Sequence, residues 1–358
     1  MAFTTNESAI SNFTIPFTQG LIASHILFFA IGVTGNSVVC WNVLRTLKNF
    51  KIHDFLILNL ALSDLLYAIV SFSIFIPVLQ QFLEGNGLRF DANNIICRIY
   101  SALPLYFGYA NLNSMTLLAG VRYIIIVKPQ QSSRLNDKSS IAIICIINWI
   151  LPIAFIIPQI FGVWGRFLFL ADIGLCVTYA SYTQGTSQIS HFIIVSIFQF
   201  FLPISICCWC YMEIFLEVRG SRKRVFGMTA SPSRNENTSE GLKKSTSLTL
   251  NNNKKTELAV AKTLSVILLI YLISYVPYSI ITVIVFCNPK PTPALLKVQA
   301  VMIQVTYIAN VSNPIVFLFR SPKTRAKIQE WFALIRGHCH QSKTKITNIS
   351  SPNSSIIE

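Results

Sequence analysis

Seven long runs of apolar residues, almost free of charged side chains, constrain this chain more than any other feature. A bilayer core about 30 Å thick needs roughly 20 apolar residues per helical span. Backbone polar groups in lipid must be satisfied within their own segment, so each run predicts a transmembrane helix. The predicted fold class is an all-α membrane protein, a bundle of seven transmembrane helices. The runs cover residues of about 20–44, 55–80, 95–127, 140–161, 189–217, 258–287 and 296–319.

The basic residues predict how the bundle is oriented. The formal net charge is +15, with 29 Lys and Arg side chains. If the N-terminus lies outside, 24 of the 29 fall in or beside the segments that are then cytoplasmic. This asymmetry is the positive-inside pattern of multi-pass proteins. We therefore expect a plasma-membrane protein with an extracellular N-terminus, whose basic surplus faces acidic lipid headgroups and cytosolic partners rather than nucleic acid.

The segments outside the seven runs predict four regions. Residues 1–19 form an extracellular tail without a basic n-region, so no cleavable signal peptide is expected. The seven-helix domain covers 20–320, and within it the cytoplasmic loop 219–256 has too few apolar residues to fold alone. Residues 321–336 place an apolar face against a basic one, which predicts an amphipathic helix on the inner leaflet. A cytoplasmic tail, 337–358, follows it.

Several residues in these regions are candidates for modification. Asn6 and Asn12 begin Asn-X-Ser/Thr sequons in the extracellular tail, where glycosylation is expected. Cys339 follows the amphipathic helix and is a candidate for palmitoylation. Cys97 opens the third run, and Cys176 lies in the loop before the fifth. Both are on the oxidising side, where a disulfide between them would pin that loop over the mouth of the bundle.

Asp64 is the clearest functional candidate inside the membrane, because ionisable residues within spans are costly and usually functional. It lies about 15 Å deep, counted from Asp54 at about 1.5 Å per residue. Two interpretations stay open: a satisfied polar knot that holds helices together, or a hydrated pocket that can take a sodium ion. The polar groups expected at comparable depth on other spans are Asn36, Asn111, Asn310 and Asn313.

Spacing along three spans predicts inward-facing stripes. Pro104, Asn111 and Arg122 are seven and eleven residues apart, which nearly closes whole turns of a helix. Similar spacing runs through the sixth and seventh spans, where aromatic stripes suit either core packing or a ligand pocket. Prolines at 203, 277 and 314 can kink the last three spans. The predicted pocket consists of Ser101, Pro104, Arg166, Gln199, Tyr278, Thr282, Gln304 and Tyr307.

Taken in order, these landmarks resemble those of rhodopsin-like G-protein-coupled receptors over about residues 20–335. The landmark residues are Asn36, Asp64 within Leu60–Asp64, Cys97, Arg122-Tyr123, Trp149, Pro203, Tyr211, Pro277 and Asn313-Pro314. The resemblance implies that Arg122 and Tyr123 meet a heterotrimeric G protein once the sixth helix swings outward. It implies that Asp64 and Asn313 form a sodium-linked switch and that Tyr211 stabilises the active state. Arrestin and receptor kinases are the other partners it implies.

Three departures from the family pattern affect the expected switch. Val121 replaces the acidic residue that usually precedes Arg122, which leaves Glu257 as the candidate partner of that arginine. Tyr275 stands where the sixth span usually carries tryptophan. Phe317 replaces the tyrosine that ends the seventh-span motif. These changes affect the inactive-state lock rather than the fold.

The pocket residues limit the ligand class. Amine receptors carry aspartate at the position of Pro104, and retinal opsins carry lysine at the position of Tyr307, so neither class is expected. The loop sequence around Trp164–Phe167 and Asp172–Cys176 resembles the moody-like invertebrate receptors and their melatonin and medium-chain fatty-acid receptor relatives. A small, mostly apolar extracellular ligand is therefore expected, with no cofactor besides an allosteric sodium ion.

Two other classes of function compete with a receptor. A channel or transporter would need a polar stripe through the bundle, and below Asn111 the sequence offers little except Arg122. An enzyme would need paired carboxylates or a metal-spaced histidine cluster at one depth, and neither pattern is present. We therefore expect a receptor and no enzymatic activity.

Overall fold

A computed structural model of the chain describes residues 15–45, 52–83, 95–135, 138–170, 175–178, 185–229, 263 and 265–320. The chain separates into two compact units, Met1–Pro314 and Ile315–Glu358. The first unit holds the helix bundle, and residues 315–320 are the described part of the second. Five predicted features lie outside the described residues: the sequons at Asn6 and Asn12, Glu257, the amphipathic helix 321–336, and Cys339.

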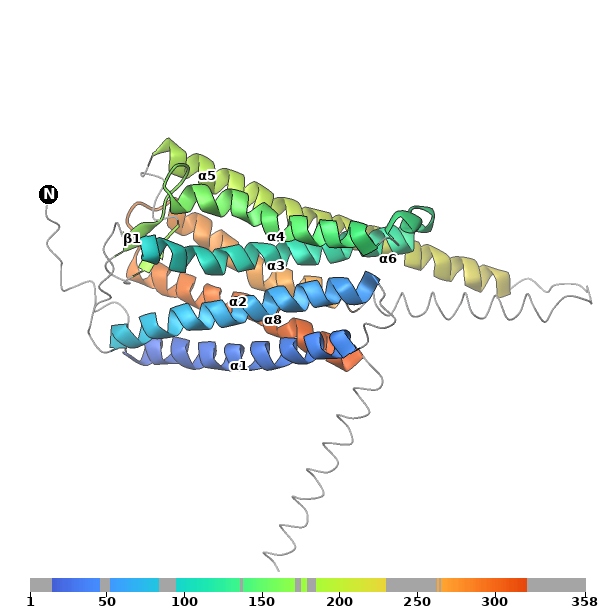
Figure 1. Cartoon of the computed structure of the whole chain (residues 1–358), viewed down its shortest axis with the longest axis horizontal. Helices are drawn as coiled ribbons and strands as arrows, with labels where there is room; N and C mark the ends of the chain where they lie inside the picture. The colour runs from blue at the N-terminus through green and yellow to red at the C-terminus, as the bar shows by residue number, and fades with distance from the viewer. Residues whose placement is uncertain are drawn as a thin grey trace, which may run out of the picture. The chain divides into compact units, whose positions relative to one another are not determined.

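The described part of the chain is a bundle of long helices (Figure 1). Seven of these helices are long and apolar enough to cross a membrane, which confirms the predicted fold class. The fifth span is built from α5, η5 and α6 in succession, and the sixth span is the helix Ser265–Phe286. The labelled elements are α1 Ile15–Arg45, α2 Ile52–Leu83, α3 Ile95–Val127, η3 Pro129–Leu135, α4 Lys138–Ile160, β1 Leu168–Leu170, β2 Leu175–Val177, α5 Thr186–Ser196, η5 Ile197–Phe201, α6 Leu202–Thr229 and α8 Pro293–Arg320.

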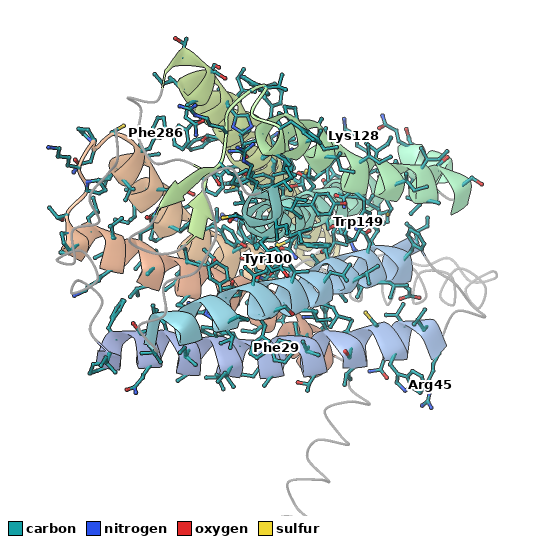
Figure 2. All side chains as sticks on the ribbon, turned by 60° about the vertical axis from the view of Figure 1, so that its left-hand side comes forward. Phe29, Arg45, Tyr100, Lys128, Trp149 and Phe286 are labelled. Carbon is teal, nitrogen blue, oxygen red and sulfur yellow. The ribbon has the colours of Figure 1, made fainter. Side chains whose placement is uncertain are left out.

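The helices separate a lipid-facing surface from a packed interior. Ile143, Ile146 and Ile150 of α4 are each more than half exposed, as side chains that face acyl chains would be. α3 lies at the centre, in contact with α2, α4 and α6. Figure 2 shows Arg45 and Lys128 at one end of the bundle and Phe286 at the other. This separation agrees with the predicted cytoplasmic location of the basic residues.

The first and last helices of the bundle approach each other closely at Gly35. A Cβ atom at that position would lie 2.7 Å from Cγ of Pro314 on α8. Small residues let backbones approach in this way, and such contacts replace the hydrophobic driving force that helices lack in lipid. Gly35 therefore permits α1 to pack directly against the proline of the seventh span.

A short hairpin covers one end of α3. Strands β1 and β2 pair antiparallel with Phe169 opposite Cys176, and β2 lies against α3. Side chains of α5 fix the segment before β1. Gln188 Oε1 accepts a hydrogen bond of 2.9 Å from the backbone N–H of Arg166, and its Nε2 donates to the carbonyl of Thr178. Ser187 Oγ accepts from the N–H of Gly165 at 3.1 Å. The loop is thus held by polar side chains in the first turn of α5, just before the predicted fifth run of 189–217.

The fifth span contains a five-residue π-helix, η5, just before Pro203. Single π turns occur mostly at functional sites and accommodate one extra residue in a helix. Gln199 lies within this turn and is 1% exposed, so the turn directs an amide side chain into the bundle. The sequence analysis predicted a proline kink here but not the π turn.

α6 continues to Thr229, beyond residue 219 where the predicted third cytoplasmic loop begins. The first part of that loop is therefore helical, which its residues tolerate. The stretch of the fifth span that is long and apolar enough to cross a membrane ends at Gly220, close to the predicted start of the loop.

Candidate functional site

Asp64 lies at the junction of three helices, fully buried. Its Oδ1 accepts a hydrogen bond of 2.5 Å from Nδ2 of Asn111 on α3, and its Oδ2 accepts one of 2.8 Å from Nδ2 of Asn313 on α8. Asn111 Nδ2 also donates to Ser63 Oγ at 3.3 Å. A buried carboxylate is costly unless it is hydrogen-bonded, and each of its oxygens here has an amide donor. The structure therefore brings together Asp64, Asn111 and Asn313, as the sequence predicted.

Asn36 and Asn310 are the other two amides of the predicted polar pocket. Both are buried, but Asn36 Nδ2 donates to the Gly32 carbonyl of its own helix at 2.9 Å, and neither bonds to Asp64. The side-chain oxygens of Asn36, Asn310 and Asn313 have no hydrogen-bond partner among the described residues. An asparagine one turn after a small residue can satisfy itself locally, which residue depth alone does not reveal. The three amide oxygens are free to accept bonds from water or to coordinate a hard cation.

A second polar network, which the sequence analysis did not predict, joins α2, α3 and α4. Trp149 Nε1 donates to Asn59 Oδ1 at 2.9 Å, and Asn59 Nδ2 donates to Ser114 Oγ at 2.9 Å. Asn148 Nδ2 donates to the same hydroxyl at 2.9 Å. Trp149 was noted only as a family landmark. Ser114 lies three residues after Asn111 and therefore on a neighbouring part of the same helix face, but that position does not reveal its partners on α2 and α4.

The cytosolic end of α3 carries a buried cation. Arg122 is 2% exposed, and its guanidinium interacts electrostatically with the hydroxyl of the buried Tyr211 on α6. Val121 beside it is also buried and has no polar group to offer. The ring of Tyr123 packs 4.7 Å from Trp209 and receives the Lys128 ammonium at 5.5 Å. The structure therefore brings Arg122 and Tyr211 close enough to interact, and their role as an activation switch stays a prediction.

The remaining switch candidates lie on the sixth and seventh spans. Tyr275 stacks on the fully buried Tyr271, with ring centroids 4.1 Å apart and planes 8° from parallel. Pro277 is exposed on the outer face of its helix, whereas Pro314 is buried. Phe317 is half-buried in the second unit. Tyr275, at the position where the family usually has tryptophan, is thus held against a second tyrosine one turn earlier.

The eight predicted pocket residues separate into several groups. Gln304 and Tyr307 on α8 lie beside His25 of α1, where Gln304 Nε2 contacts His25 Nδ1 at 2.6 Å. Gln199 Oε1 accepts from Asn113 Nδ2 at 3.3 Å, between η5 and α3. The side chain of Arg166 is exposed on the loop rather than directed inward. The others are half-buried on α3 and the sixth span, namely Ser101, Pro104, Tyr278 and Thr282.

Cys97, in the first turn of α3, is disulfide-bonded and 1% exposed. β2, which carries Cys176, lies against α3, but the side chain of Cys176 lies outside those described. The six other cysteines of the described residues are free thiols. The pairing of Cys97 with Cys176 therefore stays a prediction, and the neighbouring backbones favour it.

Residues 35–317 match the family of 7 transmembrane receptors of the rhodopsin family, and the chain belongs to this family. It is 24% identical over 302 residues to a GQ-coupled rhodopsin of Mizuhopecten yessoensis, covering 84% of this chain and 56% of that protein. It is 25% identical to a melanopsin of Phodopus sungorus, covering 84% and 59%. This chain thus spans little more than half the length of these relatives. The crystal structure of squid rhodopsin has the same fold, with a TM-score of 0.70 at 21% identity, covering 95% of this chain and 92% of the other.

Proposed function

We propose that the chain is a receptor that binds a small, mostly apolar molecule from outside and activates a heterotrimeric G protein inside. The observation that carries this proposal is Arg122, a buried cation at the cytosolic end of α3 beside Tyr211 of α6. A buried charge is stable only while neighbouring groups compensate it. A movement of the helices around Arg122 would therefore expose a cation that a cytosolic partner can bind.

Signal transmission needs a part of the bundle that has two arrangements, with an equilibrium that both the outer and the inner binding site can shift. Asp64 ties α2, α3 and α8 through two amide hydrogen bonds, so a shift of one of these helices changes contacts on the other two. The Asn59 network holds α2, α3 and α4 in fixed register beside it. We propose that the helices around Asp64 move on activation while the Asn59 network stays fixed.

A sodium ion is the proposed allosteric partner of the Asp64 site. Hard cations prefer oxygen ligands, and the Asp64 carboxylate and the Asn313 amide oxygen lie in one cluster. When bound, a monovalent cation would neutralise the buried carboxylate and so favour the conformation that encloses it. The oxygen atoms of Asp64 and Asn313 are therefore suitable ligands for a sodium ion.

The ligand class follows from two positions. Pro104 cannot pair with an ammonium group, which disfavours an amine. The named relatives are opsins, yet Tyr307 stands where an opsin has its retinal-binding lysine. Lys297 does not replace that lysine, because it lies near the start of α8, over the ring of Phe17. We therefore propose that this receptor takes a diffusible ligand rather than covalent retinal. Adding retinal to the purified protein should give no visible absorption band, and a band that survives denaturation in acid would overturn this part of the proposal.

The finer kinship is also a proposal. An identity of 24–25% to opsins fits many branches of the family, and the loop sequence at Trp164–Phe167 supports the moody-like receptors and their melatonin and fatty-acid receptor relatives. Arrestin, receptor kinases and acidic membrane lipids are the further proposed partners. The plasma membrane, with the N-terminus outside, is the proposed location.

Nucleotide exchange on a co-expressed G protein tests the function and separates it from a channel or transporter. Arg122→Ala should reduce exchange to background while surface expression stays close to that of the wild-type protein. Arg45→Ala is the matched control, because Arg45 is exposed at the same end of the bundle and stacks on Trp41 of its own helix. Undiminished exchange in Arg122→Ala, or an ion current with no exchange in the wild type, would refute the proposal.

A further inference from the structure

The loop between α4 and β1 is attached to α5 along two helical turns rather than at one point. Its backbone is bonded to Ser187 and Gln188 in the first turn. Trp164 Nε1 donates a hydrogen bond of 3.0 Å to Ser190 Oγ. The Trp164 ring also meets the His191 ring edge-on, with centroids 4.8 Å apart. A segment bonded at several points along a helix cannot shift without moving that helix.

Gly165 brings the backbone of the loop into direct contact with α5. Its φ of 65° lies in the left-handed region, and a Cβ atom there would lie 2.6 Å from Cγ of His191. His191 is 1% exposed, and its Nε2 contacts the Phe155 carbonyl of α4 at 3.1 Å. The imidazole is thus enclosed between the loop and α4, so the loop cannot slide along α5 without displacing this ring.

Gln188 of α5 joins both ends of the hairpin. Its Oε1 accepts from the N–H of Arg166, just before β1, and its Nε2 donates to the carbonyl of Thr178, just after β2. The hairpin cannot therefore move apart from α5 without losing these bonds. The loop, the hairpin and α5 form one body, which we call the outer unit and which consists of residues 164–170, 175–178 and α5.

An aromatic contact connects the outer unit to the sixth span. Phe192 of α5 stacks on Phe286, the last residue of the sixth span, with ring centroids 4.0 Å apart and planes 21° from parallel. Both side chains are buried. Figure 2 shows Phe286 at the end of the bundle where the hairpin lies. Because protein interiors are close-packed and resist compression, a displacement of one ring of this pair displaces the other.

The outer unit can move as a body because α5 ends at a π turn. η5 follows α5 directly, and Pro203 comes two residues after η5. Sharp bends in helices occur mainly at prolines and at π turns, and the fifth span has both at this point. A displacement of α5 is therefore passed sideways to the sixth span more readily than along the fifth span.

We propose that the outer unit couples the extracellular loop to the sixth span. A molecule that displaces the loop from outside would also displace α5, and Phe192 would carry that displacement to Phe286. The consequence for signalling rests on the proposed function, in which movement of the sixth span admits the G protein. The coupling gives the outer surface a route to this helix that does not pass through Asp64.

Amide hydrogen exchange tests the coupling in the purified full chain in phosphatidylcholine nanodiscs, without ligand or G protein. The reporters are the backbone N–H groups of Cys287 and Asn288, at the outer end of the sixth span. They donate to the carbonyls of Val283 and Val285 at 2.9 and 3.1 Å. Their exchange rates measure how often this end of the helix opens.

Trp164→Phe removes the bond to Ser190 but keeps an aromatic ring against His191. It should raise exchange at both reporters by about fivefold, the equivalent of one neutral hydrogen bond. Gln188→Ala cuts both ends of the hairpin from α5 and should raise it further. Tyr106→Phe is the matched control, because it also removes an aromatic donor, here the 3.0 Å bond to the Trp149 carbonyl between α3 and α4. It should leave the reporters unchanged.

Phe192→Leu removes the stack on Phe286 and should uncouple the reporters from the loop. Trp164→Phe should then have no effect on Cys287 beyond that of Phe192→Leu alone, so the two substitutions should not be additive. The N–H of Gly165, bonded to Ser187 Oγ at 3.1 Å, should stay protected in Phe192→Leu, which shows that the outer unit remains folded.

Two results would overturn the coupling. One is unchanged exchange at Cys287 and Asn288 in both Trp164→Phe and Gln188→Ala. The other is full additivity of Trp164→Phe and Phe192→Leu, which would show that the two contacts act separately. Coupled exchange in a wild-type chain that promotes no nucleotide exchange on any G protein would instead refute the proposed function and leave the coupling standing.

Discussion

The bundle contains two groups of buried polar residues that differ in how well they are satisfied. Around Asp64 and Ser114, amide donors from neighbouring helices reach the carboxylate and the hydroxyl. By contrast, the amide oxygens of Asn36 on α1 and Asn310 on α8 have no hydrogen-bond partner among the described residues. A hydrogen-bonded polar group inside the bilayer fixes helices relative to one another, whereas a group without a partner can bind water or an ion. The comparison separates polar residues that hold the bundle together from polar residues that can still form a bond.

Ser114→Ala tests the structural side of this comparison and should have the largest effect. Removing the hydroxyl leaves the Asn59 amide without its acceptor, at about 1–3 kcal/mol for a buried group. It also removes one of the two bonds of Asn148 Nδ2, at about 1 kcal/mol, and leaves the 3.4 Å bond to the Ala110 carbonyl. We expect about 2–4 kcal/mol of destabilisation, measured as a fall in the thermal midpoint of the purified receptor. Ser73→Ala is the control, because Ser73 is exposed and bonds within its own helix. Equal midpoints for the two variants would show that the Asn59 network does not hold the helices.

Val121→Asp extends the comparison to the cytosolic end, where Arg122 lacks the adjacent acidic residue usual in the family. A new carboxylate should favour the inactive conformation by about 1.5 kcal/mol, the lower value for a charged hydrogen bond. Agonist-free nucleotide exchange should then fall by roughly tenfold at equal surface expression. Glu257→Ala should have the opposite effect if that residue is the existing partner of Arg122. If Val121→Asp leaves basal exchange unchanged while Glu257→Ala raises it sharply, Glu257 alone holds the lock.

Asp64→Asn should have the smallest effect on folding and a selective effect on function. An amide keeps much of the volume and hydrogen bonding of the carboxylate but removes the charge that a cation would neutralise. We expect sodium to lower agonist affinity by about fivefold in the wild type, a coupling of about 1 kcal/mol, and to have no effect in Asp64→Asn. Agonist titrations with sodium replaced by N-methylglucamine measure this. If wild-type affinity ignores sodium, the Asp64 site only holds helices together and belongs wholly to the structural side of the comparison.

Much of the fold could be predicted because a chain that crosses a bilayer must form helices, and because the membrane sets their length. The predicted run 95–127 coincides with α3, and the run 140–161 matches α4 closely, since the thickness of the hydrocarbon core sets span length. The pairing of Asp64 with Asn111 and Asn313 was also predictable from depth. Depth does not specify which way a side chain points, so it could not predict that Asn36 bonds to its own helix rather than to Asp64.

Other features gave no usable signal in one sequence. His25 is a single histidine in an apolar run, and nothing near it in sequence reveals Gln304, its partner on the last span. Ser114 and Asn59 depend on the packing of three helices at a common point. The π turn at Ile197–Phe201 lies in a run so uniformly apolar that no periodicity marks a change of helix type. Contacts between distant spans and local changes of winding therefore had to come from the structure.

The π turn changes the direction in which the side chains of the fifth span point around the helix axis. His191 and Gln199 are both 1% exposed, although eight residues of uninterrupted α-helix overshoot two whole turns by roughly 80°. The wider winding of η5 absorbs most of that overshoot, so both side chains can point to the interior. The fifth span holds the extracellular loop at one end and carries Tyr211 toward Arg122 at the other. The π turn between these two parts lets each of them take its own rotation about the helix axis.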